Sequence, residues 1–133
     1  FVYSIVILLS CEAKEFHKAV KNYKSIIEDI TALCISESKV NPTLIHNMLD
    51  HGEYVDDRAL KCYLKCIYLN MGMINENGDI SEEAVKENAG VEDERIRQHV
   101  VDTCTSVSGQ DLCEKAFKLS KCTYDTVKSW HPS

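Results

Sequence analysis

Cysteine spacing constrains the fold of this chain more than any other feature of its sequence. The chain has seven cysteines, and six of them follow an apolar N-terminal run, with gaps of 27, 3, 37, 8 and 8 residues between them. These six are Cys34, Cys62, Cys66, Cys104, Cys113 and Cys122. An even set of cysteines at such spacings is typical of a disulfide framework, whose connectivity the count alone leaves open.

Helix geometry narrows the possible pairs. Cys62 and Cys66 lie four residues apart in the helical pattern of residues 58–69, so their side chains share one face of a helix. A rigid helix holds them about 6 Å apart, which argues against a bond between them. Cys113 and Cys122 are nine residues, about two and a half helical turns, apart and should therefore face different neighbours.

Residues 1–13 form a short apolar run that ends in small residues. We interpret this run as a secretory signal peptide that is cut after Ala13 and is incomplete at its N-terminus, because neither Met nor a basic segment precedes it. The alternative is a buried strand or a first helical turn. The run is too short to span a bilayer. Its removal takes away Cys11 and Glu12, which leaves six cysteines and a net charge of −5 instead of −6.

Composition favours a single all-α domain over residues 14–133. The 133 residues include only two prolines and five glycines, and alternation of the kind found in strands is scarce. We expect helices at 14–37, 42–51, 56–71, 79–90, 92–104 and 111–122, followed by a tail at 123–133. The acidic charge, without a basic cluster, argues against a nucleic-acid partner.

Apolar periodicity supports the first and central helices. In the first helix, apolar residues recur at spacings of three and four, namely Phe16, Val20, Tyr23, Ile27, Ile30 and Cys34. The central helix carries two cysteines on one face and a second apolar row, formed by Leu60, Leu64, Ile67 and Met71. Apolar residues on more than one side predict a helix that is enclosed by its neighbours.

Capping signals mark two further helices. Asn41 should cap the second helix, with Pro42 at its first position and Gly52 at its end. Asp79 and Glu82 have the spacing of a capping box, which predicts that the short fourth helix opens at Asp79 and ends at Gly90.

The six-cysteine pattern resembles that of the insect odorant-binding proteins, which include the pheromone-binding proteins. The resemblance covers the whole mature chain, and the gaps of 3 and 8 residues are its most specific part. It implies a compact six-helix domain that three disulfides cross-link around an apolar cavity. It also implies the pairs Cys34–Cys66, Cys62–Cys113 and Cys104–Cys122.

The resemblance also indicates where a ligand would bind. It places the cavity between the first, fourth, fifth and sixth helices, with the central helix at its floor. Positions relative to the matching cysteines then predict that the lining includes Ile27, Leu64, Tyr68, Ile74, Val101 and Leu119. Apolar face and location add Leu49, Met71 and Trp130. Ordinary core packing is the alternative for every one of them, and Tyr68 or Tyr124 would supply a hydroxyl to orient a ligand.

Other readings of the cysteines and histidines are weaker. A zinc site would use Cys62, Cys66 and His99, but no second close pair of ligands is present. An even set of six cysteines leaves no free thiol for nucleophilic catalysis. The tail after Cys122 has 11 residues, which is too short to form a new helix inside the cavity at low pH. We expect it to fold over the cavity mouth instead, with Trp130 as a plug. Local or solvated roles are expected for His17, His46, His51, His99 and His131.

Taken with the resemblance, these features predict a secreted carrier and no enzyme. Its partners would be small hydrophobic volatile ligands, and the resemblance implies transport through extracellular (sensillar) fluid to an olfactory receptor. We expect no cofactor, no metal, no stable membrane insertion, and a monomer or weak homodimer. The alternative function is that of a non-olfactory carrier or scavenger of small lipophilic compounds on the same fold.

Overall fold

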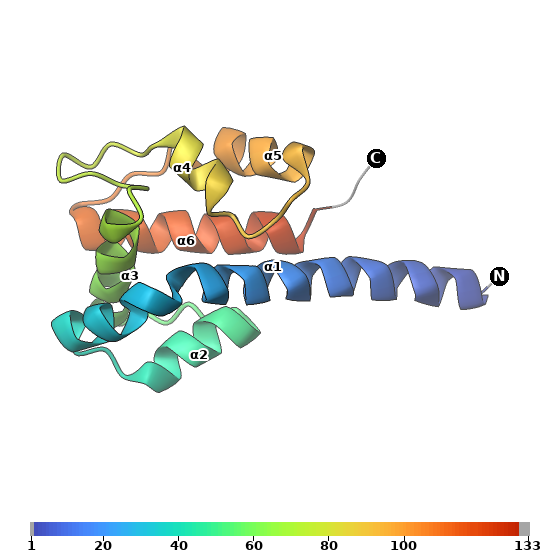
Figure 1. Cartoon of the computed structure of the whole chain (residues 1–133), viewed down its shortest axis with the longest axis horizontal. Helices are drawn as coiled ribbons and strands as arrows, with labels where there is room; N and C mark the ends of the chain where they lie inside the picture. The colour runs from blue at the N-terminus through green and yellow to red at the C-terminus, as the bar shows by residue number, and fades with distance from the viewer. Residues whose placement is uncertain (1, 131–133) are drawn as a thin grey trace.

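The protein is an all-α domain. The computed structural model describes the backbone of residues 2–130 and the side chains of residues 16–130. Over this part of the chain it has six helices, no strand, and one isolated β-bridge between Ile74 and Ile80 (Figure 1). The helices are α1 (Val2–Ser38), α2 (Pro42–His51), α3 (Arg58–Asn70), α4 (Glu82–Glu87), α5 (Glu94–Cys104) and α6 (Leu112–Lys128). The predicted all-α class is confirmed.

The N-terminal run continues into α1. Its backbone is helical from Val2 onward, whereas Cys11 and the other side chains before Phe16 lie outside the described residues. Cleavage after Ala13 therefore stays a prediction.

Helix α3 is the centre of the core. It packs against α6 on one side and α1 on the other, while α5 packs on the far part of α6 and α2 packs on α1 (Figure 1). Leu60, Leu64 and Ile67 have no exposed side-chain surface, and seven of the 13 residues of α3 are buried. Burial on several faces confirms the prediction of an enclosed central helix.

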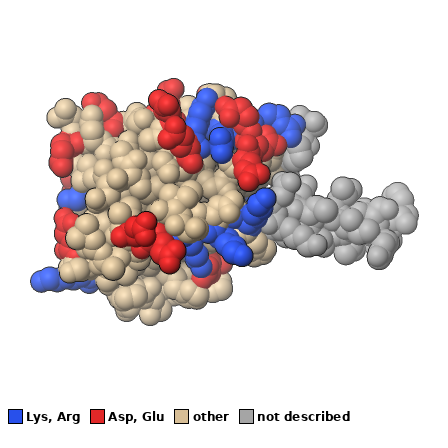
Figure 2. Space-filling model, viewed as in Figure 1, with Lys and Arg blue, Asp and Glu red and all other residues tan. Residues whose placement is uncertain are grey.

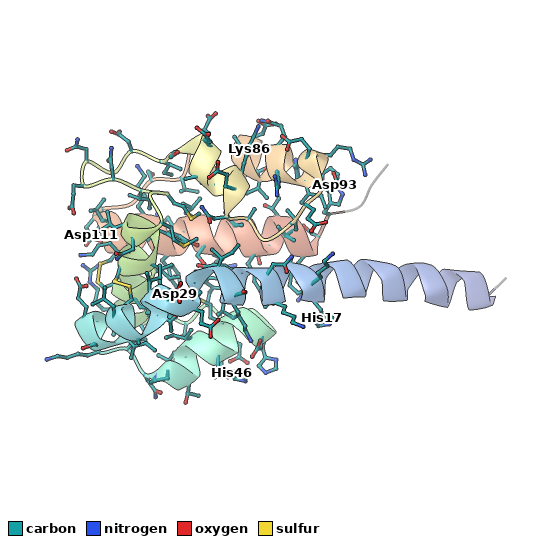
Figure 3. The ribbon with its side chains drawn as sticks, viewed as in Figure 1. His17, Asp29, His46, Lys86, Asp93 and Asp111 are labelled. Atoms are coloured by element: carbon teal, nitrogen blue, oxygen red, sulfur yellow. A yellow bond between two sulfur atoms is a disulfide. The ribbon has the colours of Figure 1, made fainter. Side chains whose placement is uncertain are left out.

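Three disulfides join these helices, and they are the pairs that the resemblance implies. Cys34–Cys66 links α1 to α3, Cys62–Cys113 links α3 to α6, and Cys104–Cys122 links α5 to α6. Yellow S–S bonds are visible beside α3 in Figure 3. With sequence separations of 18 to 51 residues, each bond stabilises the fold by about 3–4 kcal/mol in the loop-entropy model, though the contributions need not add.

The predicted ends of α2 are confirmed, but the predicted start of α4 is wrong. The Asn41 side chain accepts a hydrogen bond from the Thr43 amide, and Gly52 has φ +68°. At α4 the N-cap is Ser81, whose side chain accepts from the Ala84 amide, and the helix ends at Glu87 with Asn88 as its C-cap, before the predicted end at Gly90. Asp79 belongs to the preceding turn instead, because its amide donates to Asn75 Oδ1.

Helix α6 is longer than predicted. It continues for six residues past Cys122, so residues 123–128 are helical and do not belong to a tail. The extension is stabilised by packing, since Thr126 is buried against the Cys104–Cys122 bond and Val127 packs on the core. Because Thr126 is polar, the apolar periodicity of the sequence does not show that the helix continues past Cys122. His131 lies outside the described residues.

Candidate ligand-binding pocket

A pocket opens between α1 and α6. Helix α2, helix α3 and two connecting segments complete its wall. The residues that line it are Phe16, Ala19, Val20, Tyr23, Leu49, Tyr54, Tyr68, Ala89, Ser120, Thr123, Tyr124 and Val127. Its empty space is about 450 Å³, part of which is open to solvent. None of these lining residues carries a charged side chain, so the pocket suits the apolar body of a small molecule.

The pocket has a buried side and a more open side. Tyr68 and Ser120 are almost completely buried, at 3% and 6% exposure. Phe16, Thr123 and Val127 are only partly buried. The floor of the pocket, which we define as Tyr68 of α3 and Ser120 of α6, is therefore formed by the two helices that the Cys62–Cys113 bond joins.

Hydroxyl groups gather at this floor. The Tyr54 hydroxyl donates to the Ser120 carbonyl at 3.1 Å and lies 2.9 Å from Ser120 Oγ. The Tyr68 side chain neighbours those of Ser120 and Tyr23. Burial raises the pKa of Tyr68 to about 12. Burial, together with the nearby Tyr68, also raises the pKa of Tyr23 well above its usual value. The cluster is therefore neutral at physiological pH.

Aromatic rings form the wall beside this cluster. The Tyr124 ring stands edge-on to Phe16 at 5.2 Å and to Tyr54 at 5.8 Å between centroids. Gly52 makes this packing possible, since a Cβ atom there would lie 2.7 Å from Tyr124 Cε1. The C-terminal end of α2 therefore contacts the Tyr124 ring of α6 beside the pocket.

The wall opposite α2 comes from the segment between α4 and α5. Gly90 lies so close to α1 that a Cβ atom there would be 2.5 Å from the Ala19 carbonyl oxygen. The Asn22 side chain fixes this approach by donating to the Gly90 carbonyl at 3.0 Å. Ala89 consequently faces the pocket. Among the lining residues, Ala89 is the one that comes from the α4–α5 region. The resemblance implied instead that both helices form walls of the cavity.

Two of the nine predicted lining residues, Leu49 and Tyr68, line this pocket. Five others are buried in the core, namely Ile27, Leu64, Ile74, Val101 and Leu119. Met71 is partly buried against that core, and the Trp130 ring lies 5.1 Å from His99 and outside the lining. Whether these seven contact a ligand stays a prediction.

Several lining residues were not predicted. Phe16, Val20 and Tyr23 belong to the apolar row of the first helix, and that row was a usable signal for them. Ser120 and Tyr54 gave no such signal. They lie 66 positions apart, and only the fold brings their hydroxyls together.

Figure 2 shows acidic and basic side chains interspersed on the visible face. Within the described residues, no group of three His, Cys, Asp or Glu side chains could hold a metal ion, and no helix has the length and apolarity to cross a membrane. The described histidines are exposed, and His17 and His46 point outward from their helices (Figure 3).

Comparisons with known proteins identify the family. A model of the PBP/GOBP family matches residues 16–126. General odorant-binding protein 57e of Drosophila melanogaster is 26% identical over 94 residues, which cover 69% of each chain. General odorant-binding protein 69a of the same species is 22% identical over 125 residues, or 92% of this chain and 84% of the relative.

Solved structures share the fold. A medfly odorant-binding protein is 26% identical, with a TM-score of 0.63 over 76% of this chain and 90% of that chain. Odorant-binding protein 5 of Apis mellifera has a TM-score of 0.66 over 82% and 93% of the two chains, and at 22% identity it shows likeness of fold alone. Because the family model spans most of the sequence and the six-helix, three-disulfide fold agrees with it, the chain belongs to the PBP/GOBP family of insect odorant-binding proteins.

Proposed function

We propose that this protein is a secreted carrier that binds small hydrophobic odorants or pheromones non-covalently and moves them through aqueous fluid to olfactory receptors. The observation that carries the proposal is the uncharged, mainly apolar pocket between α1 and α6 in a chain of this family. Residues 1–13 would direct secretion, and the three disulfides suit an oxidising extracellular compartment.

The mechanism is transfer of apolar ligand surface out of water. Burial of such surface contributes about 25 cal/mol per Å². Ordering costs reduce this gain, so a ligand of about 10–20 heavy atoms should bind with roughly micromolar affinity, or about 8 kcal/mol. Binding and release need no covalent step, because only reversible contacts with the pocket hold the ligand.

A blocking substitution tests the proposal. Thr123 is partly buried and lines the pocket, so Thr123→Trp should fill it and weaken binding of N-phenyl-1-naphthylamine by about tenfold or more. Lys118→Trp is the matched control, because Lys118 is an exposed residue of the same helix outside the lining. Fluorescence titration of the oxidised protein measures both variants. Absence of saturable binding to the wild type, or equal weakening in both variants, would contradict a pocket carrier.

A further inference from the structure

The connection between α3 and α4 contains a chemically reactive pair of residues, Asn77 and Gly78 (Figure 1). Among the asparagines of this chain, Asn77 is the one that a glycine follows. The backbone nitrogen of the next residue can attack an asparagine carboxamide, and glycine hinders this attack least because it has no side chain. Asn77 is exposed to solvent. Water can therefore reach its carboxamide, and the pair is a candidate for spontaneous modification.

A hydrogen-bonded turn holds this pair in the native fold. Asn75 organises the turn, because its Oδ1 atom accepts from the amides of Asn77 and Asp79, both at 2.9 Å. The Asn75 amide donates to the Asp79 carbonyl at 3.0 Å, and the Gly78 amide donates to the Asn75 carbonyl at 2.9 Å. The nitrogen that would attack Asn77 is therefore already engaged in a hydrogen bond.

Helix α6 holds the same turn from the other side. The Lys115 ammonium group donates to the Gly78 carbonyl oxygen. Gly78 is buried, and a Cβ atom added to it would lie 3.5 Å from Leu112 Cδ2. Attack on Asn77 requires the Gly78 nitrogen to lose the proton that it donates within the turn. These contacts consequently oppose the reaction for as long as the turn stays closed.

The reaction needs no reagent except water. A solvent base removes the Gly78 amide proton, and the nitrogen forms a bond to Asn77 Cγ. The Cγ–Nδ2 bond then breaks, and the released nitrogen takes up a proton and leaves as ammonia. Water opens the resulting five-membered imide at either of its carbonyl carbons. Attack at Cγ gives aspartate, whereas attack at the backbone carbonyl gives isoaspartate, in which the main chain runs through Cβ and Cγ.

We infer that Asn77 is a latent modification site, which the closed Asn75 turn protects and which forms aspartate and isoaspartate when this turn opens. Isoaspartate adds a carbon atom to the backbone and so breaks the register of the Asn75–Asp79 pair. Aspartate adds a negative charge next to Glu76 and Asp79 in sequence. Either product weakens the turn that protected the site. The α3–α4 connection, whose Met73 is buried in the core, is then less firmly held.

The test compares the oxidised full chain with the same chain reduced and unfolded in guanidinium chloride. Both are incubated in mildly alkaline buffer, and mass spectrometry of the tryptic peptide 66–86 follows loss of the amide. Asp-N protease, which cleaves before aspartate but not before isoaspartate, separates the two products. Asn77 should react at least about tenfold faster in the unfolded chain. Asn70 lies in the same peptide but precedes Met71, and should stay unchanged in both states.

A pair of matched variants isolates the contribution of the turn. Asn75→Ala removes the oxygen that holds two backbone amides, and should speed modification of Asn77 in the folded protein by about tenfold. In the unfolded chain it should change nothing, because no turn is present there. Asn88→Ala is the control. Its side chain donates to the Ala84 carbonyl at 2.8 Å, outside the turn, and the rate at Asn77 should stay the same.

The results decide both parts of the inference. Equal rates in the folded and unfolded chains would refute protection by the turn, as would equal acceleration by Asn75→Ala and Asn88→Ala. Absence of product at Asn77 in the unfolded chain would refute the site itself. Thermal unfolding of the modified protein should begin at a lower temperature than that of the unmodified protein, and an unchanged transition would refute the loosening. Near-ultraviolet circular dichroism confirms that each variant is folded.

Discussion

The floor of the pocket and its α2 side are held in place by different kinds of interaction. Cys62–Cys113 joins α3 to α6, the two helices that form the floor. Beside that bond, Lys61 Nζ lies 2.5 Å from Asp56 Oδ1 and 3.0 Å from Glu114 Oε1, with its side chain 11% exposed. Helix α2 has no cysteine. An ion pair between Lys24 of α1 and Asp50 of α2, both partly exposed, contributes to its attachment.

This difference indicates a division of roles. The cross-linked side fixes the polar groups of the floor, whose hydrogen-bond geometry must be kept. The α2 side supplies Leu49 and borders Tyr124 through Gly52, where an apolar ligand needs contact but no directional bond. We therefore expect substitutions on the two sides to differ in size of effect, from about 4 kcal/mol at the disulfide to a few tenths at the α2 ion pair.

The largest effect should come from removing the bond between the two helices that form the floor. Replacing Cys62 and Cys113 together with Ala should lower the free energy of unfolding by about 4 kcal/mol, because this bond closes a 51-residue separation. Urea denaturation measures the loss. The double variant of Cys104 and Cys122, with a separation of 18, is the comparison and should lose about 3 kcal/mol. A larger loss for the shorter loop would contradict the loop-entropy account.

Gly52→Ala should have the next largest effect. The position has φ +68°, which costs a residue with a Cβ atom about 1–2 kcal/mol, and the new atom would also displace Tyr124. Gly72→Ala is a matched control, because Gly72 has φ +71° and nothing within 4 Å of its added Cβ. Thermal unfolding should show a smaller loss for Gly72→Ala, and probe titration should show weaker binding only for Gly52→Ala. Equal losses of stability in the two variants would mean that Tyr124 moves away from the added methyl group at no cost in free energy.

The two buried tyrosines of α3 should respond in opposite directions. Tyr68→Phe removes a hydroxyl from the pocket lining, where its side chain neighbours Ser120 and Tyr23, and should lower the free energy of unfolding by up to about 1 kcal/mol. Tyr63→Phe removes a buried hydroxyl with no partner among the described residues, and the neighbouring Thr31 hydroxyl already donates to the Ile27 carbonyl. This change should be neutral or stabilising by up to about 1 kcal/mol. Equal destabilisation by both variants would place a hidden hydrogen bond at Tyr63.

The cross-linked side of the molecule was the more predictable from sequence. Cysteine spacing carried the family resemblance and with it the three pairs, while apolar periodicity placed α1 and α3. Helix ends set by short-range side-chain bonds were less certain. Asn41 caps α2 as predicted, but the cap of α4 is Ser81 and not Asp79, because the Asp79 amide is held in the turn with Asn75.

The pocket was harder to predict, for a physical reason. Leu64 and Tyr68 occupy neighbouring turns of α3 and both are buried, yet only Tyr68 lines the described pocket. Periodicity shows which face of a helix is buried, but the separation between facing helices decides whether that face meets a side chain or a space. Ser120 is hard to predict for a second reason. This small polar residue belongs to the pocket floor only because Tyr54, which is distant in sequence, folds back onto it.

The smallest effect should be the pH-dependent attachment of α2. The Lys24 ammonium hydrogen-bonds Asp50 and holds the pKa of that carboxyl below its usual value of 3.8. His46 Nδ1 also lies 2.6 Å from Asp50 Oδ2. A carboxyl with a lowered folded-state pKa stabilises the fold above its unfolded pKa. That contribution is lost as the pH falls through the lower, folded value.

Asp50→Asn should therefore lower the free energy of unfolding by a few tenths of a kcal/mol at pH 7 and by nothing once the pH lies below the folded pKa. Urea denaturation across this pH range measures the difference between variant and wild type. Asp125→Asn is the control, because Asp125 pairs with Lys121 within α6 at 2.9 Å. Amide hydrogen exchange of α2 should quicken in Asp50→Asn alone. A difference that grows as the pH falls would reverse the sign of this linkage and remove Asp50 as an anchor of α2.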